Sequence, residues 1–413
     1  MRRVVIPAPY WGQPGHLGWT RVARFVRWLA DEGVASIVAR AGSSDRSEKT
    51  DFGEIVTVRD PIGFYRDRPP GGAAIPLRHR SRLRRTLAYL LLVPDPLVAW
   101  SRRAAHHPLL LDRAQGAELV LASSPPESVH VAAATLATRL GSRLAVDLRD
   151  GWLDEPMIPL LGSSGLQRAR HRRLERRILG RAQRVFVSSG HWQRLLCGRL
   201  PFVAARTTVL TNVCPHSELF GTGDVRREFG RPLTLLHAGK ISSSRPERRI
   251  EQLMSPLLAG LRAEAQAVGR VVFVGNLDRD ERTCLEGLTG ALIALGWTLE
   301  VRPAVPRVEA LRLIGSADGM LLLSSSMASL PAKLFDYLPS GRPILMVAPE
   351  GSAVWEVAEE LPQAVPVSGG GSHAIVAVRS FLARCQEPDP EWAVPESFSE
   401  DYVRAVFLGA LPE

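Results

Sequence analysis

Short runs of apolar residues alternate with segments of helical periodicity along the first half of the chain. The runs are bounded by polar or turn residues and cover positions 2–9, 35–40, 117–124, 142–150 and 183–189. The first run is followed by a glycine-containing turn over residues 10–18 and by a predicted helix over residues 19–31. Strands that alternate with helices are typical of a parallel sheet built from βαβ units.

The same alternation starts again in the second half. Apolar runs cover positions 232–239, 270–276, 297–301, 318–323 and 342–349, and helices are predicted to begin near residues 246 and 279. The final segment is predicted to be a helix that Ser397 or Ser399 caps. No internal sequence repeat is evident.

We therefore predict an α/β protein with two tandem Rossmann-like, doubly wound domains. The predicted domains are residues 1–210 and residues 211–395, and a C-terminal helical segment, residues 396–413, is expected to pack back on the first domain. Open parallel sheets bind ligands at the carboxyl ends of their strands, so two facing sheets predict a cleft between the domains.

Composition narrows the class of protein. The chain is 45% hydrophobic and 23% charged, which is typical of a soluble globular protein, and its four scattered cysteines favour a reducing cytosol and no metal site. No secretory signal is recognised, and the apolar run 87–93 is too short to span a bilayer. The net charge of +10 is uneven, because residues 1–200 hold 32 basic and 17 acidic residues. The first domain is therefore expected to face an anionic partner.

Lysine is rare in this chain, which has only Lys49, Lys240 and Lys333. Lys333 lies in the stretch SLPAKLFDYLPSG, where Pro331 suits the first position of a short helix and Gly341 suits its exit. This helix follows the predicted strand 318–323, so its first N–H groups would favour an anion. Lys333 adds positive charge there.

A carboxylate that could accept hydrogen bonds from hydroxyl groups lies close to Lys333 in the sequence. Asp336 is three residues after Lys333, so its carboxylate could accept hydrogen bonds from hydroxyls beside a bound phosphate. A nucleoside diphosphate fits a phosphate site with an adjacent hydroxyl acceptor. The alternative is that Lys333 and Asp336 are only a solvent-exposed helix pair.

The second retained lysine follows another strand. Lys240 comes directly after Gly239 at the end of the predicted strand 232–239, and Gly239 permits close approach of the backbone. Lys240 and Arg245 could reach the same anion, although a solvated loop lysine is the alternative. Two of three lysines at predicted strand ends favour the anion site.

The chain resembles the family 4 glycosyltransferases, which have the GT-B fold, and in particular a bacterial branch with an FRDPW-like element. The resemblance covers nearly the whole chain, and the stretches that carry it are residues 123–152, 209–213, 235–247, 273–281 and 331–352. It implies a retaining transferase that uses a nucleotide-diphosphate sugar as co-substrate and needs no metal or other cofactor.

The resemblance also assigns roles to residues. It implies that Lys240 and the helix beginning near Leu330 and Pro331 hold the donor diphosphate, with Lys333 adjacent, and that Asp336 holds the ribose. Cleavage of the bond between the anomeric carbon and the diphosphate builds negative charge on the leaving group, which Lys240, Arg245 and Lys333 are predicted to stabilise. The resemblance further implies front-face attack, in which a phosphate oxygen of the leaving group helps to take the acceptor proton.

Some positions depart from the family pattern. Alanine stands where the first glutamate of a paired motif is common, valine replaces a common glycine and glycine replaces the usual proline, at Ala328, Val213 and Gly151. The histidine that many relatives carry at a strand end of the first domain is replaced by Arg149 and Asp150. Asp150 is therefore the candidate catalytic residue of this domain, and a structural loop-capping aspartate is the alternative.

The first domain is expected to hold the acceptor. Gly15, His16 and Gly18 lie in the turn after the first strand and form the predicted acceptor loop, although His16 could simply cap that loop. The turn does not match the dinucleotide fingerprint, so NAD is disfavoured. His130 and His237 are predicted to be packing residues.

Arginine clusters suggest the acceptor class. Five arginines between Arg78 and Arg85 precede the apolar run 87–93, and a second basic helix, residues 167–181, has Leu174 and Ile178 on one face. These features favour peripheral association with the anionic inner face of the plasma membrane and a lipid-linked acceptor. A solvated helix face and a soluble small-molecule acceptor are the alternatives.

Other functional classes remain open at this point. A sugar-nucleotide epimerase would share the architecture, and Ala328 is compatible with a catalytically silent partner subunit. A nucleic-acid-binding protein would explain the basic half, but no aromatic stacking pattern accompanies the arginines, so no nucleic acid is expected as a partner.

Overall fold

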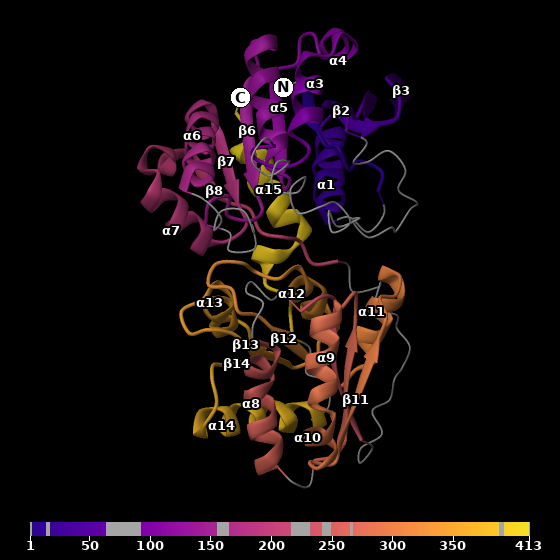
Figure 1. Ribbon diagram of the computed structural model, residues 1–413, viewed down its shortest axis with the longest axis vertical. Coiled ribbons are helices and arrows are strands. Elements are labelled where there is room, and N and C mark those ends of the chain that lie inside the picture. Colours follow the sequence, from indigo (N-terminus) through magenta and orange to yellow (C-terminus); the bar gives the residue numbers. More distant parts are fainter. Residues whose placement is uncertain are drawn as a thin grey trace. The chain divides into compact units, whose positions relative to one another are not determined.

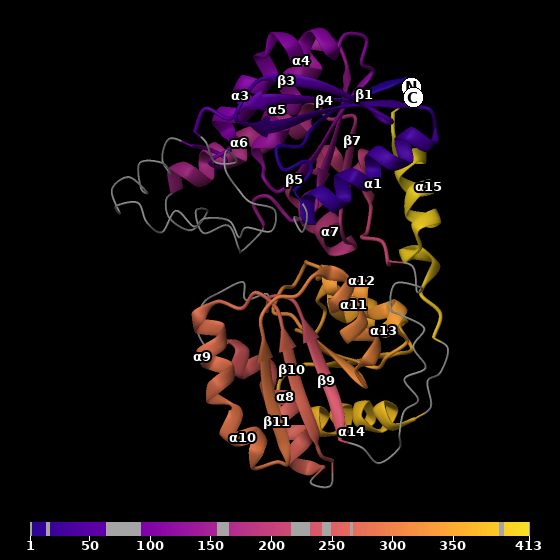
Figure 2. The ribbon, with the colours of Figure 1, turned by 90° about the vertical axis from the view of Figure 1, so that its right-hand side faces the viewer.

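The chain divides into two compact units in the computed structural model (Figures 1 and 2). The structure describes residues 2–13, 17–62, 92–154, 165–215, 232–241, 249–264, 267–387 and 392–412. Unit 1 comprises Met1–Leu210 and Arg404–Glu413, and unit 2 comprises Thr211–Val403. Within the described residues, no helix is both long enough and apolar enough to cross a membrane.

Unit 1 is built on an eight-stranded sheet with the order β3-β4-β2-β1-β5-β6-β7-β8. The strands are β1 (Arg3–Pro7), β2 (Ala35–Gly42), β3 (Arg46–Thr50), β4 (Gly53–Arg59), β5 (Leu119–Ser124), β6 (Arg143–Leu148), β7 (Arg184–Val187) and β8 (Thr207–Val209). All neighbours pair in parallel except β3 and β4, which form an antiparallel hairpin. The central strands are nearly continuous apolar runs, as parallel strands covered on both faces require.

Helices complete unit 1. They are α1 (Leu17–Asp31), α3 (Val98–His106), α4 (Pro108–Arg113), α5 (Ser128–Leu140), α6 (Gly165–Arg181), α7 (Gly190–Arg199) and the 3₁₀ helix η2 (Pro201–Arg206). The C-terminal helix α15 (Glu400–Ala410) adds its residues from Arg404 onward to this unit. Phe407 of α15 is fully buried and stacks on Phe25 of α1, with the ring centroids 4.4 Å apart. Ser399, one of the two predicted caps of α15, accepts a hydrogen bond from the Tyr402 N–H.

Unit 2 contains a six-stranded parallel sheet with the order β11-β10-β9-β12-β13-β14. The strands are β9 (Leu233–Ala238), β10 (Gly269–Val274), β11 (Trp297–Arg302), β12 (Gly319–Leu323), β13 (Ile344–Val347) and β14 (Ala364–Val367). The helices are α8 (Arg249–Ala263), α9 (Arg279–Gly287), α10 (Thr289–Ile293), α11 (Arg307–Ser316), α12 (Ala332–Tyr337), η4 (Leu338–Ser340), α13 (Ala353–Glu360), α14 (Ser372–Gln386) and η5 (Glu396–Phe398).

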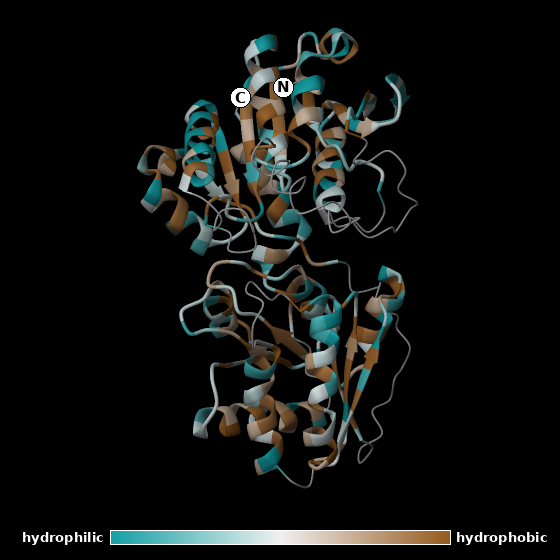
Figure 3. Ribbon diagram, in the orientation of Figure 1, coloured by the Kyte–Doolittle hydropathy of each residue, from teal (hydrophilic) through white to brown (hydrophobic). Residues whose placement is uncertain are grey.

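Two apolar layers cover the two faces of this second sheet. Successive side chains of a strand point to opposite faces, so Leu235 packs under α8 and α14 while Leu236 packs under α11, α12 and α13. Leu321 and Leu322 on β12 divide in the same way. Figure 2 shows these helices around the strands, and Figure 3 shows that the strands are mostly apolar. The sheet is therefore fixed, and only its strand ends and the following loops are available for chemistry.

Candidate functional site

The predicted anion site lies at the carboxyl end of β9. Lys333, the second residue of α12, extends to the chain that follows this strand, where its Nζ donates to the Lys240 carbonyl oxygen at 2.5 Å. Its Nζ also lies 2.9 Å from Nε2 of His237. The structure thus brings Lys333 and Lys240 together, although the contact is with the Lys240 backbone, and the Lys240 side chain is exposed. Arg245 lies outside the described residues.

Two glycines allow close backbone packing at this strand end. Gly239 has φ of +92°, and a Cβ there would lie 3.9 Å from Lys333 Nζ. Gly275, at the end of the neighbouring β10, has no room for a side chain, because its Cβ would lie 2.6 Å from the Gly239 carbonyl oxygen. The two glycines allow the loops after β9 and β10 to touch, so backbone lies beside the Lys333 amine where bulkier side chains would otherwise lie.

Burial controls the charge of Lys333. Removal from water lowers the pKa of Lys333 to about 7, while the nearby Glu281 carboxyl opposes that shift. Burial also lowers the pKa of His237 well below its ordinary value, with the neighbouring Lys333 charge acting in the same direction. A fully buried imidazole beside a lysine is therefore neutral. The amine has no hydrogen-bonded carboxylate among the described residues, so an anionic ligand would supply the missing counter-charge.

Glu281 on α9 is a further member of this centre. One carboxyl oxygen, Oε2, accepts from the Asp278 N–H in a capping box, while the buried Oε1 has no hydrogen-bond partner among the described residues. Burial raises the pKa of Glu281, and the charges of Lys240 and Lys333 oppose that shift. The sequence analysis missed this residue, because its DxxE spacing indicates only a helix cap.

Asp336 forms an ion pair with an arginine of another helix. Its Oδ1 accepts from Nη2 of Arg307 at 2.6 Å, and its Oδ2 accepts from Nη1 at 3.3 Å. The carboxylate predicted to hold a ribose is therefore engaged by a guanidinium on α11.

The segment before α12 also differs in detail from the prediction. Pro331 precedes the first helical residue instead of occupying that position, and both Pro331 and Leu330 are half-buried. The Ala328 side chain is buried. A glutamate at this position would therefore place its carboxylate away from solvent, which is unfavourable for a charged group. Gly341 has φ of +65° and ends the short helical stretch, as predicted.

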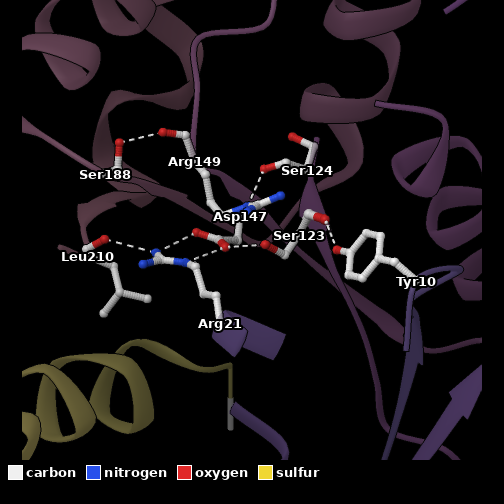
Figure 4. Close-up of polar contacts among 8 residues, drawn as sticks. All are labelled: Tyr10, Arg21, Ser123, Ser124, Asp147, Arg149, Ser188 and Leu210. Carbon is white, nitrogen blue, oxygen red and sulfur yellow. Dashed lines mark hydrogen bonds and ion pairs between the residues drawn. The ribbon is translucent and has the colours of Figure 1, made fainter. Parts of the chain in front are cut away.

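The strand ends of unit 1 carry a buried ion pair (Figure 4). Asp147, the second-last residue of β6, accepts from Nε and Nη2 of Arg21 at 2.8 Å each and from the Ser123 hydroxyl at 2.6 Å. The Tyr10 hydroxyl donates to the Ser123 carbonyl oxygen at 2.9 Å. Burial raises the pKa of Tyr10 to about 12. All of these groups are buried and mutually satisfied, so the network holds α1, β5 and β6 in register.

Arg149 and Asp150 follow this network directly. The Arg149 guanidinium donates to the carbonyl oxygens of Ser124 and Pro125 at 2.8 and 2.7 Å, so it braces the loop after β5. Asp150 accepts no side-chain hydrogen bond from any described residue, and burial raises its pKa while Arg149 opposes the shift. The catalytic role of Asp150 and the loop-capping alternative both stay predictions.

Glu127, which the sequence analysis did not single out, is a buried acidic residue whose pKa the Asp150 charge affects. It lies in the loop between β5 and α5, and burial together with the Asp95 charge raises the pKa of Glu127 to about 8, with Asp150 contributing further. At neutral pH this side chain is mostly a carboxylic acid. A protonated carboxyl can donate a hydrogen bond to a hydroxyl group and can also accept one from it. The run of prolines before Glu127 gave no signal of this role.

Other predicted residues of unit 1 lie elsewhere. Gly15 and His16 are outside the described residues, and Gly18 lies inside α1 and not in the preceding loop, because the helix begins two residues earlier than predicted. His130 is fully buried and packs against Trp152, as expected for a packing residue. His237 is also buried, but its Nε2 is in addition within hydrogen-bond distance of the Lys333 amine.

The basic helix 167–181 corresponds to α6, which Figure 3 shows as strongly polar. Ile178 is buried and Leu174 is half-buried, as the predicted apolar face requires, and Glu175 is buried against Arg199. The exposed arginines of α6 are Arg168, Arg170, Arg172, Arg173, Arg176, Arg177 and Arg181. Arg176 also lies over the Phe202 ring, 5.7 Å from its centroid. The cluster between Arg78 and Arg85 lies outside the described residues.

Gly151 is fixed by packing against Trp192. A Cβ at this position would lie 2.1 Å from the indole ring, and the ring itself is buried. We expect Gly151→Ala to destabilise unit 1 by about 1–3 kcal/mol, because the ring or the strand-end loop must move. Urea unfolding measures the loss. Gly180→Ala on the exposed face of α6, where a methyl meets nothing within 4 Å, is the control and should be stabilising by about 0.4–1 kcal/mol. Equal effects of the two substitutions would contradict the packing explanation.

Comparison with known proteins gives a family-model match over part of the chain and a fold. Residues 18–213 match the family model described as "Glycosyl transferase 4-like domain", slightly less than half of the chain. Among solved structures, sucrose-phosphate synthase from Thermosynechococcus elongatus is 14% identical with a TM-score of 0.60, over 98% of this chain and 95% of that one. No curated protein matches the sequence.

Two further structures show the same architecture. Anabaena Alr3699/HepE in complex with UDP and glucose is 15% identical with a TM-score of 0.58, over 100% of both chains. The UDP-forming alpha,alpha-trehalose-phosphate synthase from Burkholderia xenovorans, in complex with glucose-6-phosphate, is 13% identical with a TM-score of 0.60, over 99% of this chain and 100% of that one. The predicted fold class is thereby confirmed: the chain has the two-domain GT-B fold.

Proposed function

We propose that this protein is a retaining glycosyltransferase that moves a sugar from a nucleotide-diphosphate sugar to a hydroxyl acceptor. The observation that carries the proposal is the Lys333 amine at the end of β9, held by backbone and imidazole and lacking a hydrogen-bonded carboxylate among the described residues. The glycosyl transferase 4-like match and the GT-B fold support the reaction class. UDP is the first nucleotide to test, because two of the similar proteins are described with UDP.

Charge stabilisation is the chemistry that unit 2 would supply. Bond cleavage at the anomeric carbon transfers negative charge to the diphosphate, and a protonated Lys333 lies in a partly desolvated position where it stabilises that charge strongly. The exposed Lys240 side chain follows Gly239 and would contact the same phosphates. No metal is required by this arrangement, because the lysines supply the positive charge. A phosphate oxygen of the leaving group then helps to take the acceptor proton, which gives retention of configuration.

Unit 1 would bind the acceptor. Asp150 and the protonated Glu127 offer an acceptor and a donor for a hydroxyl group at the carboxyl ends of β5 and β6. We propose a lipid-linked glycan precursor as the acceptor and peripheral association with an anionic membrane, supported by the exposed arginines of α6. The alternative is a soluble acceptor. Transfer rates to a lipid-linked and to a soluble acceptor, measured side by side, decide between the two.

Calorimetric binding in the presence of a chelator tests the donor assignment. We expect one of UDP, GDP, dTDP and ADP to bind saturably, and the matching monophosphate and nucleoside to bind about tenfold or more weakly, since charge-assisted hydrogen bonds to the lysines are lost. Equal affinity for the nucleoside and its diphosphate, or no binding at all, would contradict a diphosphate site.

Turnover with the corresponding sugar nucleotide then identifies the reaction. The anomeric configuration of the product, read by NMR, decides between retention and inversion. Release of an epimerised sugar without any acceptor would identify an epimerase, and binding without turnover against lipid-linked and soluble acceptors would identify a silent partner subunit, in keeping with Ala328.

A further inference from the structure

His237 is a buried imidazole whose two nitrogens have different partners. Its Nδ1 lies 2.9 Å from the carbonyl oxygen of Leu321 on β12, and its Nε2 lies 2.9 Å from Lys333 Nζ. A carbonyl oxygen can only accept a hydrogen bond, so Nδ1 carries the proton. Nε2 is therefore left with its lone pair directed at the lysine, and the imidazole accepts from the amine.

Lys333 has acceptors for two of its possible N–H groups. These are His237 Nε2 and the Lys240 carbonyl oxygen, both on the chain at the end of β9. A neutral amine has two N–H groups, so this pair of acceptors satisfies it. A protonated amine has three, and the third requires another acceptor. An anionic ligand is such an acceptor, and its charge also favours the protonated form.

We propose that His237 is the positioning residue of Lys333, and that it makes diphosphate binding proceed with uptake of one proton by the lysine. The second half of this inference rests on the proposed function of the site. In the ligand-free protein the amine donates its two hydrogen bonds to His237 Nε2 and to the Lys240 carbonyl oxygen. When a diphosphate binds, the amine takes a proton from solvent and directs the third N–H to a phosphate oxygen.

The surrounding groups fit this coupling. Among the described residues, the charged and titratable side chains that act on Lys333 are His237 from β9 and Glu281 from α9, while the charges of the exposed Lys240 and of the Asp278 cap act on Glu281. Tyr337 of α12 is engaged instead with the Ala238 backbone, since its hydroxyl oxygen accepts from the Ala238 N–H at 2.7 Å. Among the described residues, Glu281 supplies negative charge that favours the protonated form of Lys333, but its carboxylate makes no hydrogen bond to the amine, and burial raises its own pKa.

The pH dependence follows from the direction of the pKa change. Burial lowers the pKa of Lys333 to about 7 in the free protein, and a bound diphosphate raises it again. Between these two values the complex holds one more proton than the free protein, so affinity should fall by up to about tenfold per pH unit as the pH rises above 7. Below pH 7 the lysine is already protonated when free, and this dependence disappears.

The scarcity of lysine makes the proposal directly measurable. The chain has three lysines, so protein labelled with ¹³C at lysine Cε gives three side-chain signals, which Lys49→Arg and Lys240→Arg variants assign. In the free protein we expect the Lys333 signal to titrate near pH 7.

Two substitutions of His237 then separate positioning from simple packing. His237→Phe keeps an aromatic ring beside Phe273 but removes the acceptor, and should lower the Lys333 titration by about one further pH unit, because the ammonium loses a hydrogen bond that favours it. His237→Gln keeps a side-chain acceptor and should restore most of that shift. Thermal melting shows whether each variant is folded.

Proton uptake is measured by calorimetric titration of UDP at pH 8 in two buffers with different ionisation enthalpies. We expect uptake close to one proton in the wild type. A Lys333 titration at the ordinary lysine value, or one unchanged by His237→Phe in a folded variant, would overturn the positioning role. If the lysine shifts with the variants but no nucleoside diphosphate binds, positioning is established, while the coupled uptake and the diphosphate function both fail.

Discussion

Replacing Asp147 by asparagine should destabilise unit 1 by about 3–5 kcal/mol, because the substitution leaves the Arg21 charge buried without its counter-ion. Both side chains are almost completely inaccessible to solvent, and Arg21 makes two hydrogen bonds of 2.8 Å to the carboxylate. Asparagine keeps the shape and one acceptor oxygen but removes the negative charge. In thermal unfolding the loss corresponds to a fall in Tm of roughly 6–20 °C for a unit of this size.

Two further variants distinguish loss of the charge from loss of the contact. The double variant Arg21→Met with Asp147→Leu removes both charges and should be considerably more stable than Asp147→Asn alone, since no unpaired charge remains. Arg113→Gln removes half of a partly exposed ion pair with Glu54, 3.5 Å long, and should cost about 0–1 kcal/mol. Hydrogen exchange in peptides covering β5 and β6 assigns the loss to unit 1. If Asp147→Asn and Arg113→Gln had similar effects, the network would not be the stabilising element that its burial indicates.

The sequence was sufficient for the elements that the hydrophobic pattern marks strongly. Central strands buried on both faces are continuous apolar runs, so β1, β5, β6, β9, β10 and β12 were predicted close to their observed positions. The β3–β4 hairpin was missed because β3, RSEKT, is a polar edge strand and carries little apolar signal. The edge strand β14 of the second sheet likewise gives a weak signal, because it is only four residues long and contains a proline. Short edge strands owe their structure to pairing, which a local pattern does not show.

The sequence singled out residues of the candidate site, but it did not show which groups those residues contact. Rarity singled out Lys240 and Lys333, and the strand–helix alternation placed both at strand ends. The sequence could not show that Lys333 reaches over to the β9 backbone, because the two residues are 93 positions apart. His237 was taken for a packing residue, since a histidine inside an apolar run is usually one. Its second nitrogen has meaning only once Lys333 lies beside it.

The predicted role of Asp336 is affected in the same way. Spacing on one helix indicates that Asp336 and Lys333 are neighbours, but it does not reveal that Arg307, on another helix, reaches the carboxylate first. Glu127 and Glu281 were missed for the opposite reason. Glu127 is the N-cap residue of α5 and Glu281 lies in the first turn of α9, and an acidic residue has an ordinary local explanation at both positions. Burial and neighbouring acidic charges, which arise only in the folded chain, raise their pKa values. Sequence patterns therefore indicate the edge of the sheet at which a candidate site lies, but they do not indicate which groups are paired there.

Lys333→Ala should weaken nucleoside diphosphate binding by about 10- to 150-fold. A hydrogen bond that involves a charged group contributes roughly 1.5–3 kcal/mol, and Lys333 supplies such a bond from a partly desolvated position. Lys240→Ala should cost about tenfold, because the exposed Lys240 side chain contributes charge, while its carbonyl, which holds Lys333, is retained in the variant. Calorimetry with the nucleotide that binds the wild type most tightly measures both losses.

Lys333→Arg tests whether charge alone is sufficient. A guanidinium is always protonated and is too broad for the position of an amine that lies 2.9 Å from His237 and 3.9 Å from a Cβ built on Gly239, so arginine should not restore affinity. Lys49→Ala is the matched control, since the remaining lysine lies on β3 in the other unit and should leave binding unchanged. Wild-type affinity in Lys333→Ala would remove the diphosphate from this strand end. Equal losses in Lys333→Ala and Lys49→Ala would show that the effect is general electrostatic attraction, because only a site built around the β9 terminus makes one lysine decisive and the other irrelevant.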